Sequence, residues 1–174
     1  MRRPPADRIA LLLLILGLAA LARPPVASAQ FAMAANDLIQ FTEQSFIQNV
    51  FGNQRSYAAA KKHCDQALQV QIDFVANAAQ LTDEQRQKLA LAGGGDIHRF
   101  FNDYERVKRG MTFGGIPRDQ WQAVWRKTQP LSTRFAAGLH GPRSLFAKTV
   151  ATTLNEQQRI EFEEMKKNRN IAIY

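Results

Sequence analysis

Three scattered histidines and one cysteine are the side chains best able to bind a metal ion. His63 and Cys64 are neighbours, so an imidazole nitrogen and a thiol sulfur stand next to each other in the chain. Adjacent helical residues point about 100° apart, however, so this pair does not share one helix face. His98 and His140 have no second ligand at the i+3 or i+4 spacing that would place two donors together. We therefore expect no bound metal and no cofactor.

The glycine triplet from Gly93 to Gly95, followed by Asp96, is a second candidate because free N–H groups at a helix start bind phosphate. No predicted strand precedes the triplet, and Asp96 would already place a negative charge at the cap. Each glycine also costs about 1 kcal/mol relative to alanine in a helix interior. The triplet therefore predicts a kink or short break, with Asp96 capping the next helix, and not a phosphate site.

Motifs of known active sites are missing from the sequence, which has no P-loop, G-x-S-x-G, H-E-x-x-H or C-x-x-C pattern. Acidic pairs such as Asp103 and Glu105 are typical of the solvated face of a helix. We expect no catalytic residues and a binding protein in place of an enzyme. One alternative stays open, in which an enzyme or ligand site assembles around His98, Arg99 and Asp103.

The first 29 residues have the order of a secretory signal peptide. Three arginines precede an uninterrupted apolar run over residues 9–22, and a small-residue triplet ends at Ala29. The run is shorter than the roughly 20 residues that a helix needs to cross a bilayer. We expect cleavage after Ala29, export to the periplasm or the extracellular space, and one all-helical domain over residues 30–174 without a further membrane span.

The net charge of +8 comes from short, dispersed basic clusters, and part of it lies in the expected signal peptide. Several clusters fall near predicted helix ends, where cations complement the helix dipole. We read them as solvated faces and expect no nucleic-acid partner. Cys64 is the single cysteine, so the chain has no internal disulfide and its core must hold by packing. We expect Cys64 to be buried in a helix.

Apolar residues recur every three or four positions through most of the chain after residue 35, which predicts helices. The first is expected to begin at Asn36 or Asp37, and Pro130 is expected to open a separate helix. The predicted helical segments are 36–52, 54–80, 82–92, 96–110, 118–129, 130–139, 144–153 and 156–168. No alternating run argues for a sheet. We predict an all-α fold, a single-domain helical bundle or hairpin-like cradle of about five to seven helices.

Two stretches, LTDEQR over 81–86 and LNEQQR over 154–159, resemble each other. Threonine or asparagine accepts a hydrogen bond from the backbone three residues later, and the glutamine there returns one, which is a capping box. Each stretch therefore predicts a helix start. The shared residues are Leu81, Thr82, Gln85 and Arg86 in the first stretch, and Leu154, Asn155, Gln158 and Arg159 in the second.

Such L-T-x-x-Q elements, together with a signal peptide and a helical domain, resemble the exported stress proteins of the Spy/CpxP family. Residues 81–85 fit the motif completely, and 154–158 fit with Asn155 in place of threonine. The resemblance implies a helical cradle, usually a dimer, that binds partly unfolded proteins without a cofactor. The string LTDEQRQKLALAGGGDIHRFF also resembles a group of uncharacterised exported planctomycete-type proteins, which implies membership without a function.

We therefore predict an exported binding protein, chaperone-like or an accessory factor in envelope stress, that contacts an unfolded client or a protein partner and can form a homodimer. A partner-specific structural subunit is the alternative. The candidate binding surface combines aromatic and basic side chains, and core packing is the other account of its aromatic members. Its aromatic members are Phe100, Phe101, Tyr104, Trp121 and Trp125, and its basic members are Arg106, Lys108, Arg109, Arg126 and Lys127.

Overall fold

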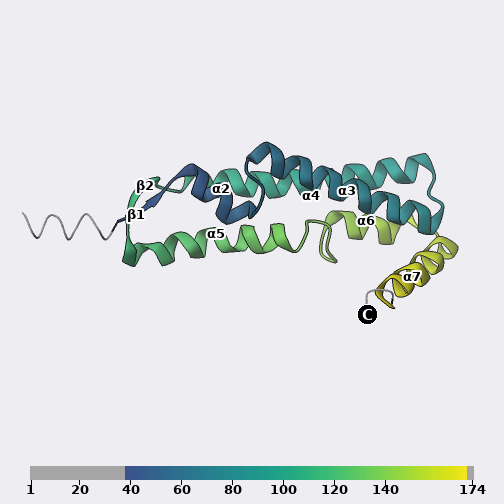
Figure 1. The fold of residues 1–174 in the computed structure, drawn as a ribbon. Coiled ribbons are helices and arrows are strands. Elements are labelled where there is room, and N and C mark those ends of the chain that lie inside the picture. Colours follow the sequence, from purple (N-terminus) through teal and green to yellow (C-terminus); the bar gives the residue numbers. More distant parts are fainter. Residues whose placement is uncertain (1–37, 172–174) are drawn as a thin grey trace, which may run out of the picture. The chain divides into compact units, whose positions relative to one another are not determined.

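Six α-helices and one short pair of strands make up residues 38–171, the part of the chain that the computed structural model describes, with side chains described to residue 168 (Figure 1). The predicted signal peptide and the predicted helix start at Asn36 or Asp37 lie outside these residues. The elements are β1 (Leu38–Phe41), α2 (Glu43–Phe51), α3 (Tyr57–Ala79), α4 (Asp83–Arg109), β2 (Gly114–Pro117), the 3-10 helix η2 (Arg118–Gln120), α5 (Trp121–Ala136), α6 (Leu145–Thr153) and α7 (Glu156–Ile171).

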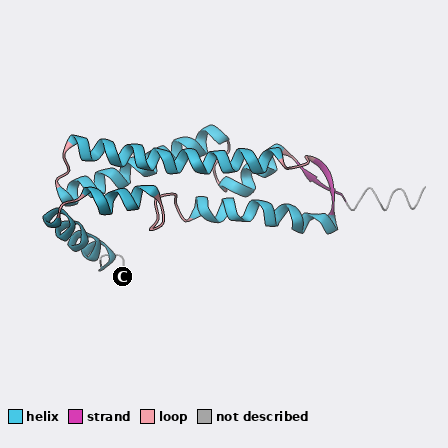
Figure 2. Cartoon of the chain, turned by 180° about the vertical axis from the view of Figure 1, so that it is seen from behind, coloured by secondary structure: helices cyan, strands magenta, loops and turns pink. Residues whose placement is uncertain are grey.

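The predicted all-α fold is confirmed, because 76% of the structure is helical and its one sheet is a short pair of strands at one end (Figure 2). From Ile39 onward the described residues belong to one compact unit. Within it α4 packs against α3, α5 and α6, while α2 packs against α5 and α7 against α3. In the described part of the chain, no helix is both long enough and apolar enough to cross a membrane.

The prediction that residues 36–52 form one helix is wrong at its beginning. Residues 38–41 form β1, which pairs with β2, and the helix begins only after Thr42. The Thr42 side chain accepts a hydrogen bond from the N–H of Ser45 at 3.0 Å and so caps α2. Phe41 is fully buried, with its ring 5.6 Å from that of Trp121. A four-residue strand is too short to show alternation, and its partner is distant in sequence.

The break predicted at the glycine triplet is also wrong, because α4 runs unbroken from Asp83 to Arg109. Gly93 is buried where α3 crosses α4, and a β-carbon there would lie 2.1 Å from Cδ1 of Leu68. At Gly94 nothing lies within 4 Å of that position. The first glycine of the triplet therefore permits close packing of two helices, and tertiary contacts outweigh its low helix propensity.

Pro130 does not open a separate helix, since α5 is continuous from Trp121 to Ala136 and contains it. Proline removes one helical hydrogen bond and costs about 3 kcal/mol in a helix interior. Pro130 is exposed, while the next residue, Leu131, is buried in the core. The helix persists because its inner face is held against α2 and α4.

The stripe predicted along α3 is confirmed, and it forms one wall of the core. Cys64, Leu68, Ile72, Val75 and Ala79 are all buried. Their spacings of four and three residues place them on one helix face. The opposing wall comes mainly from α4, and the rings of α2 and α5 close the core at one end of α4.

Candidate functional site

Both predicted capping boxes are present, and each begins a helix. Thr82 donates its N–H to Oε1 of Gln85 at 3.0 Å, and Gln85 returns its N–H to Oγ1 of Thr82 at 3.3 Å. At α7 the N–H of Asn155 donates to Oε1 of Gln158 at 3.1 Å, and the N–H of Gln158 donates to Oδ1 of Asn155 at 2.9 Å. The repeated stretch thus satisfies backbone N–H groups that a helix start leaves unpaired.

The two boxes also bind each other, which the sequence pattern did not predict. Nε2 of Gln85 donates to Oε1 of Gln158 at 3.0 Å, and Nε2 of Gln158 donates to Oε1 of Gln85 at 3.1 Å. Gln85 Nε2 also donates to the carbonyl of Thr153 at 3.1 Å. The side chains of Leu81 and Leu154 are buried beside the caps. The motif therefore joins the starts of α4 and α7 as well as capping them.

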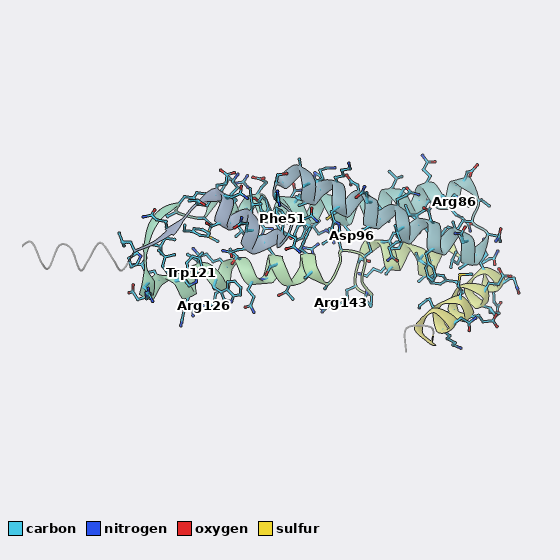
Figure 3. The ribbon with its side chains drawn as sticks, in the orientation of Figure 1. Phe51, Arg86, Asp96, Trp121, Arg126 and Arg143 are labelled. Carbon is cyan, nitrogen blue, oxygen red and sulfur yellow. The ribbon has the colours of Figure 1, made fainter. Side chains whose placement is uncertain are left out.

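The two arginines that follow the motif glutamines have different surroundings. Arg86, near the start of α4, donates through Nε to the carbonyl of Leu81 at 3.4 Å, just before the cap of that helix (Figure 3). Both arginines are exposed, and of the two Arg159 lines the groove described below.

Three aromatic members of the candidate binding surface do not lie at the surface. Phe100, Phe101 and Tyr104 are buried, and the Tyr104 ring lies 4.8 Å from that of Phe51. Burial raises the pKa of the Tyr104 hydroxyl, with smaller contributions from nearby carboxylates. The prediction that these three rings form an exposed surface is wrong, because α2, α3 and α5 cover the face of α4 that carries them.

The tryptophans on α5 divide between core and surface. Trp121 is partly buried against Phe41, whereas Trp125 is 46% exposed. Arg126 and Lys127 follow Trp125 and are exposed, with Arg126 on the outer side of α5 (Figure 3). Within the described residues neither of these cations has an ion pair. Trp125, Arg126 and Lys127 are the part of the predicted surface that a partner can reach on α5.

The basic members on α4 are partly engaged. Lys108 forms an ion pair with Glu43 at 2.5 Å, and this hydrogen bond raises the pKa of Lys108. Arg106 forms an ion pair with Asp103. Arg109 is exposed near the end of α4. The positions of these cations are explained as well by their interaction with the helix dipole and by surface ion pairs as by contact with a partner.

The alternative site around His98, Arg99 and Asp103 is not assembled. Asp103 pairs with Arg106 and also with Arg134, whose Nη1 lies 3.0 Å from Oδ2 of Asp103. Nδ1 of His98 lies 3.1 Å from the side-chain nitrogen of Asn102. In the described part of the chain, no hydrogen bond or ion pair joins any two of the three residues to each other.

Asp96 does not cap its own helix, contrary to the prediction. It is 2% exposed, and its carboxylate accepts hydrogen bonds from the N–H groups of Leu145 at 3.0 Å and Phe146 at 2.8 Å (Figure 3). These N–H groups begin α6, which Ser144 caps as well. A negative charge is favoured at a helix start. Asp96 therefore anchors α6 to the middle of α4.

An apolar groove of about 420 Å³ opens between α3, α6 and α7, and the sequence did not predict it. Arg159, Glu163 and Lys166 of α7 supply its charged side chains. Lys166 pairs with Glu163 at 2.8 Å, so the charge left over on the groove is the positive charge of Arg159. The apolar lining of this groove is Phe74, Val75, Phe146, Val150, Leu154 and Phe162.

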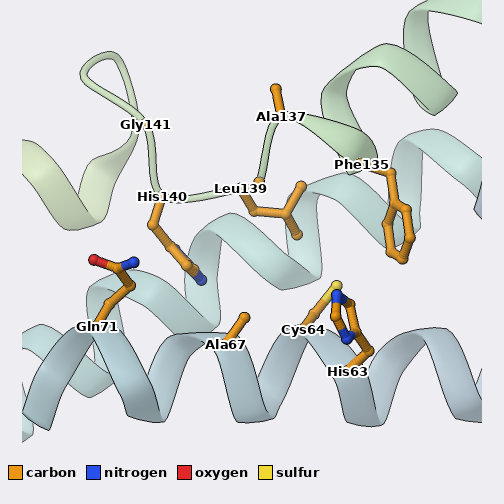
Figure 4. Close-up of a pocket in the computed structure, with 10 residues that line it drawn as sticks. His63, Cys64, Ala67, Gln71, Phe135, Ala137, Leu139, His140 and Gly141 are labelled. Atoms are coloured by element: carbon orange, nitrogen blue, oxygen red, sulfur yellow. The ribbon is translucent and has the colours of Figure 1, made fainter. Parts of the chain in front are cut away.

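A small hollow of about 260 Å³ adjoins the apolar groove, because Gln71 and His140 line both (Figure 4). His63 and Cys64 lie at its other end. Burial raises the pKa of Cys64 to about 11, with Asp65 adding to the shift and Lys61 opposing it, so the sulfur is a protonated thiol at neutral pH. The described residues contain no cluster of three or more His, Cys, Asp or Glu side chains with metal-binding geometry.

Comparison with known proteins gives no match: no protein-family model fits the chain, and no curated protein or solved structure matches it. The resemblance to the Spy/CpxP family therefore stays a prediction that rests on the residues of the two capping boxes.

Proposed function

We propose that this chain is an exported, non-enzymatic binding protein that holds partly unfolded polypeptides, in the manner implied by its resemblance to Spy/CpxP proteins. Export rests on the signal-peptide pattern of the sequence. The observation that supports binding is the apolar groove, whose walls come from α3, α6 and α7. Unfolded polypeptides expose apolar side chains, and burial of apolar area releases about 25 cal/mol per Å².

Charge on the protein supports the same proposal. Removal of the predicted signal peptide takes away four arginines and one aspartate, so the net charge falls from +8 to +5. Arg159 on the groove has no ion pair in the described part of the chain. Positive potential attracts acidic segments over about a Debye length, near 10 Å at moderate salt. Clients with acidic residues beside apolar ones are therefore expected to bind best at low salt.

Trp125, Arg126 and Lys127 on α5 offer a second contact region of the same chemistry. Trp125 is 46% exposed and stands directly before two exposed cations. Aromatic and arginine side chains carry a large share of the energy at protein interfaces. We assign this region a supporting role, because these three residues line neither the apolar groove nor the small hollow.

The experiment that tests the proposal is light scattering of a chemically denatured client as it aggregates, with and without the purified protein, at low and at high salt. We expect suppression at equimolar protein that weakens as salt rises. Absence of suppression at several-fold excess would refute the chaperone proposal. A single partner recovered at fixed stoichiometry would instead support a partner-specific subunit.

Two variants with the same substitution separate the groove from the rest of the surface. Ala151 is an exposed alanine of α6 that lines the apolar groove, and Ala90 is an exposed alanine of α4 that does not. Ala151→Arg places a long side chain over the groove, and Ala90→Arg adds the same charge elsewhere. We expect Ala151→Arg alone to reduce suppression. Because the added charge favours acidic clients, that loss would report occlusion of the apolar lining.

A further inference from the structure

The imidazole of His140 is the least satisfied polar group in the described part of the chain. Both ring nitrogens are buried, and neither has a hydrogen-bond partner among the described residues. The ring lies 5.3 Å from the ring of Phe146, in an apolar setting. Buried polar atoms without partners cost stability and are rare in native proteins, so each calls for a physical explanation.

The position of His140 suggests where partners for the two nitrogens come from. Its ring lies between the small hollow and the apolar groove, and it extends from its loop toward α3 near Gln71 (Figure 4). A ligand that extends from one hollow into the other passes the imidazole. Rotation about χ2, which has a broad minimum in histidine, turns a ring nitrogen toward either hollow.

The ring chemistry narrows the kind of ligand. Burial lowers the pKa of His140 below its usual value, although the nearby Asp96 carboxylate opposes the shift, so the imidazole is neutral at pH 7. A neutral imidazole has one donor nitrogen and one acceptor nitrogen. The side chain of Gln71 likewise offers a donor and an acceptor. A fatty acid has a carboxylate and an apolar tail but no N–H group, so it would leave the acceptor nitrogen unpaired.

An extended polypeptide supplies hydrogen-bond partners for the two nitrogens of His140 and apolar side chains for the groove. Its main chain has both N–H and C=O groups, and its alternate side chains point to opposite sides, so apolar ones can enter the groove. We propose that the hollows on either side of His140 bind an extended apolar peptide segment that carries an acidic residue, with main-chain groups paired to His140 and Gln71 and the acid near Arg159. The choice of a polypeptide ligand rests on the proposed function.

The test is fluorescence anisotropy of a short labelled peptide of leucine and valine with one glutamate, titrated with the purified protein. His140→Phe keeps a ring of similar size and removes both nitrogens, whereas His98→Phe makes the same change at an exposed position outside both hollows. We expect His140→Phe to weaken binding about thirtyfold, the effect of losing two ordinary hydrogen bonds. His98→Phe is expected to bind as the parent protein does.

A peptide with methylated main-chain nitrogens tests the main-chain contact directly. Methylation removes the main-chain N–H and leaves the carbonyl, so this peptide should bind more weakly to the parent protein than the unmodified peptide does, and His140→Phe should weaken its binding by less. Equal affinity of the parent protein and His140→Phe for the unmodified peptide would overturn the inference. Displacement of the peptide by palmitate, with the same dependence on His140, would overturn it in favour of a lipid site.

Peptide binding and aggregation suppression, measured on the same variants, distinguish this inference from the proposed function. Should His140→Phe fail to fold, Ala151→Arg supplies the test, because it blocks the groove from an exposed position and must also weaken peptide binding. Aggregation suppression that persists in both variants would retain the proposed function and refute the groove as its site. Peptide binding that depends on His140 without any suppression would retain the site and refute the chaperone role.

Discussion

Replacement of each of two adjacent glycines of α4 by alanine should have opposite effects on stability. Gly93 and Gly94 both occupy the interior of α4, so alanine gains about 1 kcal/mol of helix propensity at either position. At Gly94 the new methyl group meets nothing within 4 Å. We therefore expect Gly94→Ala to raise the free energy of unfolding by about 1 kcal/mol.

At Gly93 the same methyl group collides with α3. Its carbon would lie 2.1 Å from Cδ1 and 2.9 Å from Cδ2 of Leu68, well inside the roughly 3.5–4.0 Å of an ordinary contact between carbons. Leu68 is buried, so its side chain must shift within the core to admit the methyl group. Overpacking of a core costs about 1–3 kcal/mol, so after the propensity gain we expect Gly93→Ala to be destabilised by up to about 2 kcal/mol.

Urea unfolding followed by far-ultraviolet circular dichroism measures both variants on one scale. Leu68→Ala gives the matched background, because it removes the atoms with which the new methyl group collides. In that background we expect Gly93→Ala to stabilise the protein as Gly94→Ala does. Equal stabilisation by the two alanines in the parent protein would refute the close approach of α3 and α4 at Gly93.

Two further pairs of variants test the contacts that hold α6 and α7 to α4. Asp96→Ala removes a buried carboxylate that accepts two backbone N–H groups of α6, so we expect a loss of about 2–4 kcal/mol in the free energy of unfolding measured in urea. The half-buried cap variant Ser144→Ala should lose about 1 kcal/mol. Comparable losses at the two positions would contradict the anchoring role of Asp96. For the reciprocal glutamine pair, a double-mutant cycle of Gln85→Ala and Gln158→Ala should give a coupling free energy of about 1 kcal/mol. Strictly additive effects would mean that the two glutamines act only as separate caps.

Local interactions made several features predictable from the sequence. The capping boxes at Thr82 and Asn155, the apolar stripe of α3 and the burial of Cys64 depend on residues within a few positions of each other. Residues so near in sequence interact with each other wherever their helix lies in the fold. The predicted end of a helix at Gly110 holds for the same reason.

The candidate site was much less predictable, because its residues come from separate helices. The apolar groove draws its walls from α3, α6 and α7, and the two motif glutamines that meet are 73 positions apart. Periodicity indicates that a ring such as that of Phe100 has an apolar neighbour, and it does not indicate whether that neighbour is the core or a partner. For this reason the sequence assigned three rings to a binding surface that the structure places in the core.

By itself, the sequence determined an all-α class of fold, two capped helix starts and the inner face of α3, since each follows from propensity, capping and periodicity over a few turns. Only the tertiary structure decided that α4 is continuous through its glycines, that Asp96 caps α6 and that α5 continues through Pro130. In each of these cases a local preference of about 1 to 3 kcal/mol is outweighed by packing or a buried hydrogen bond from an element distant in the chain.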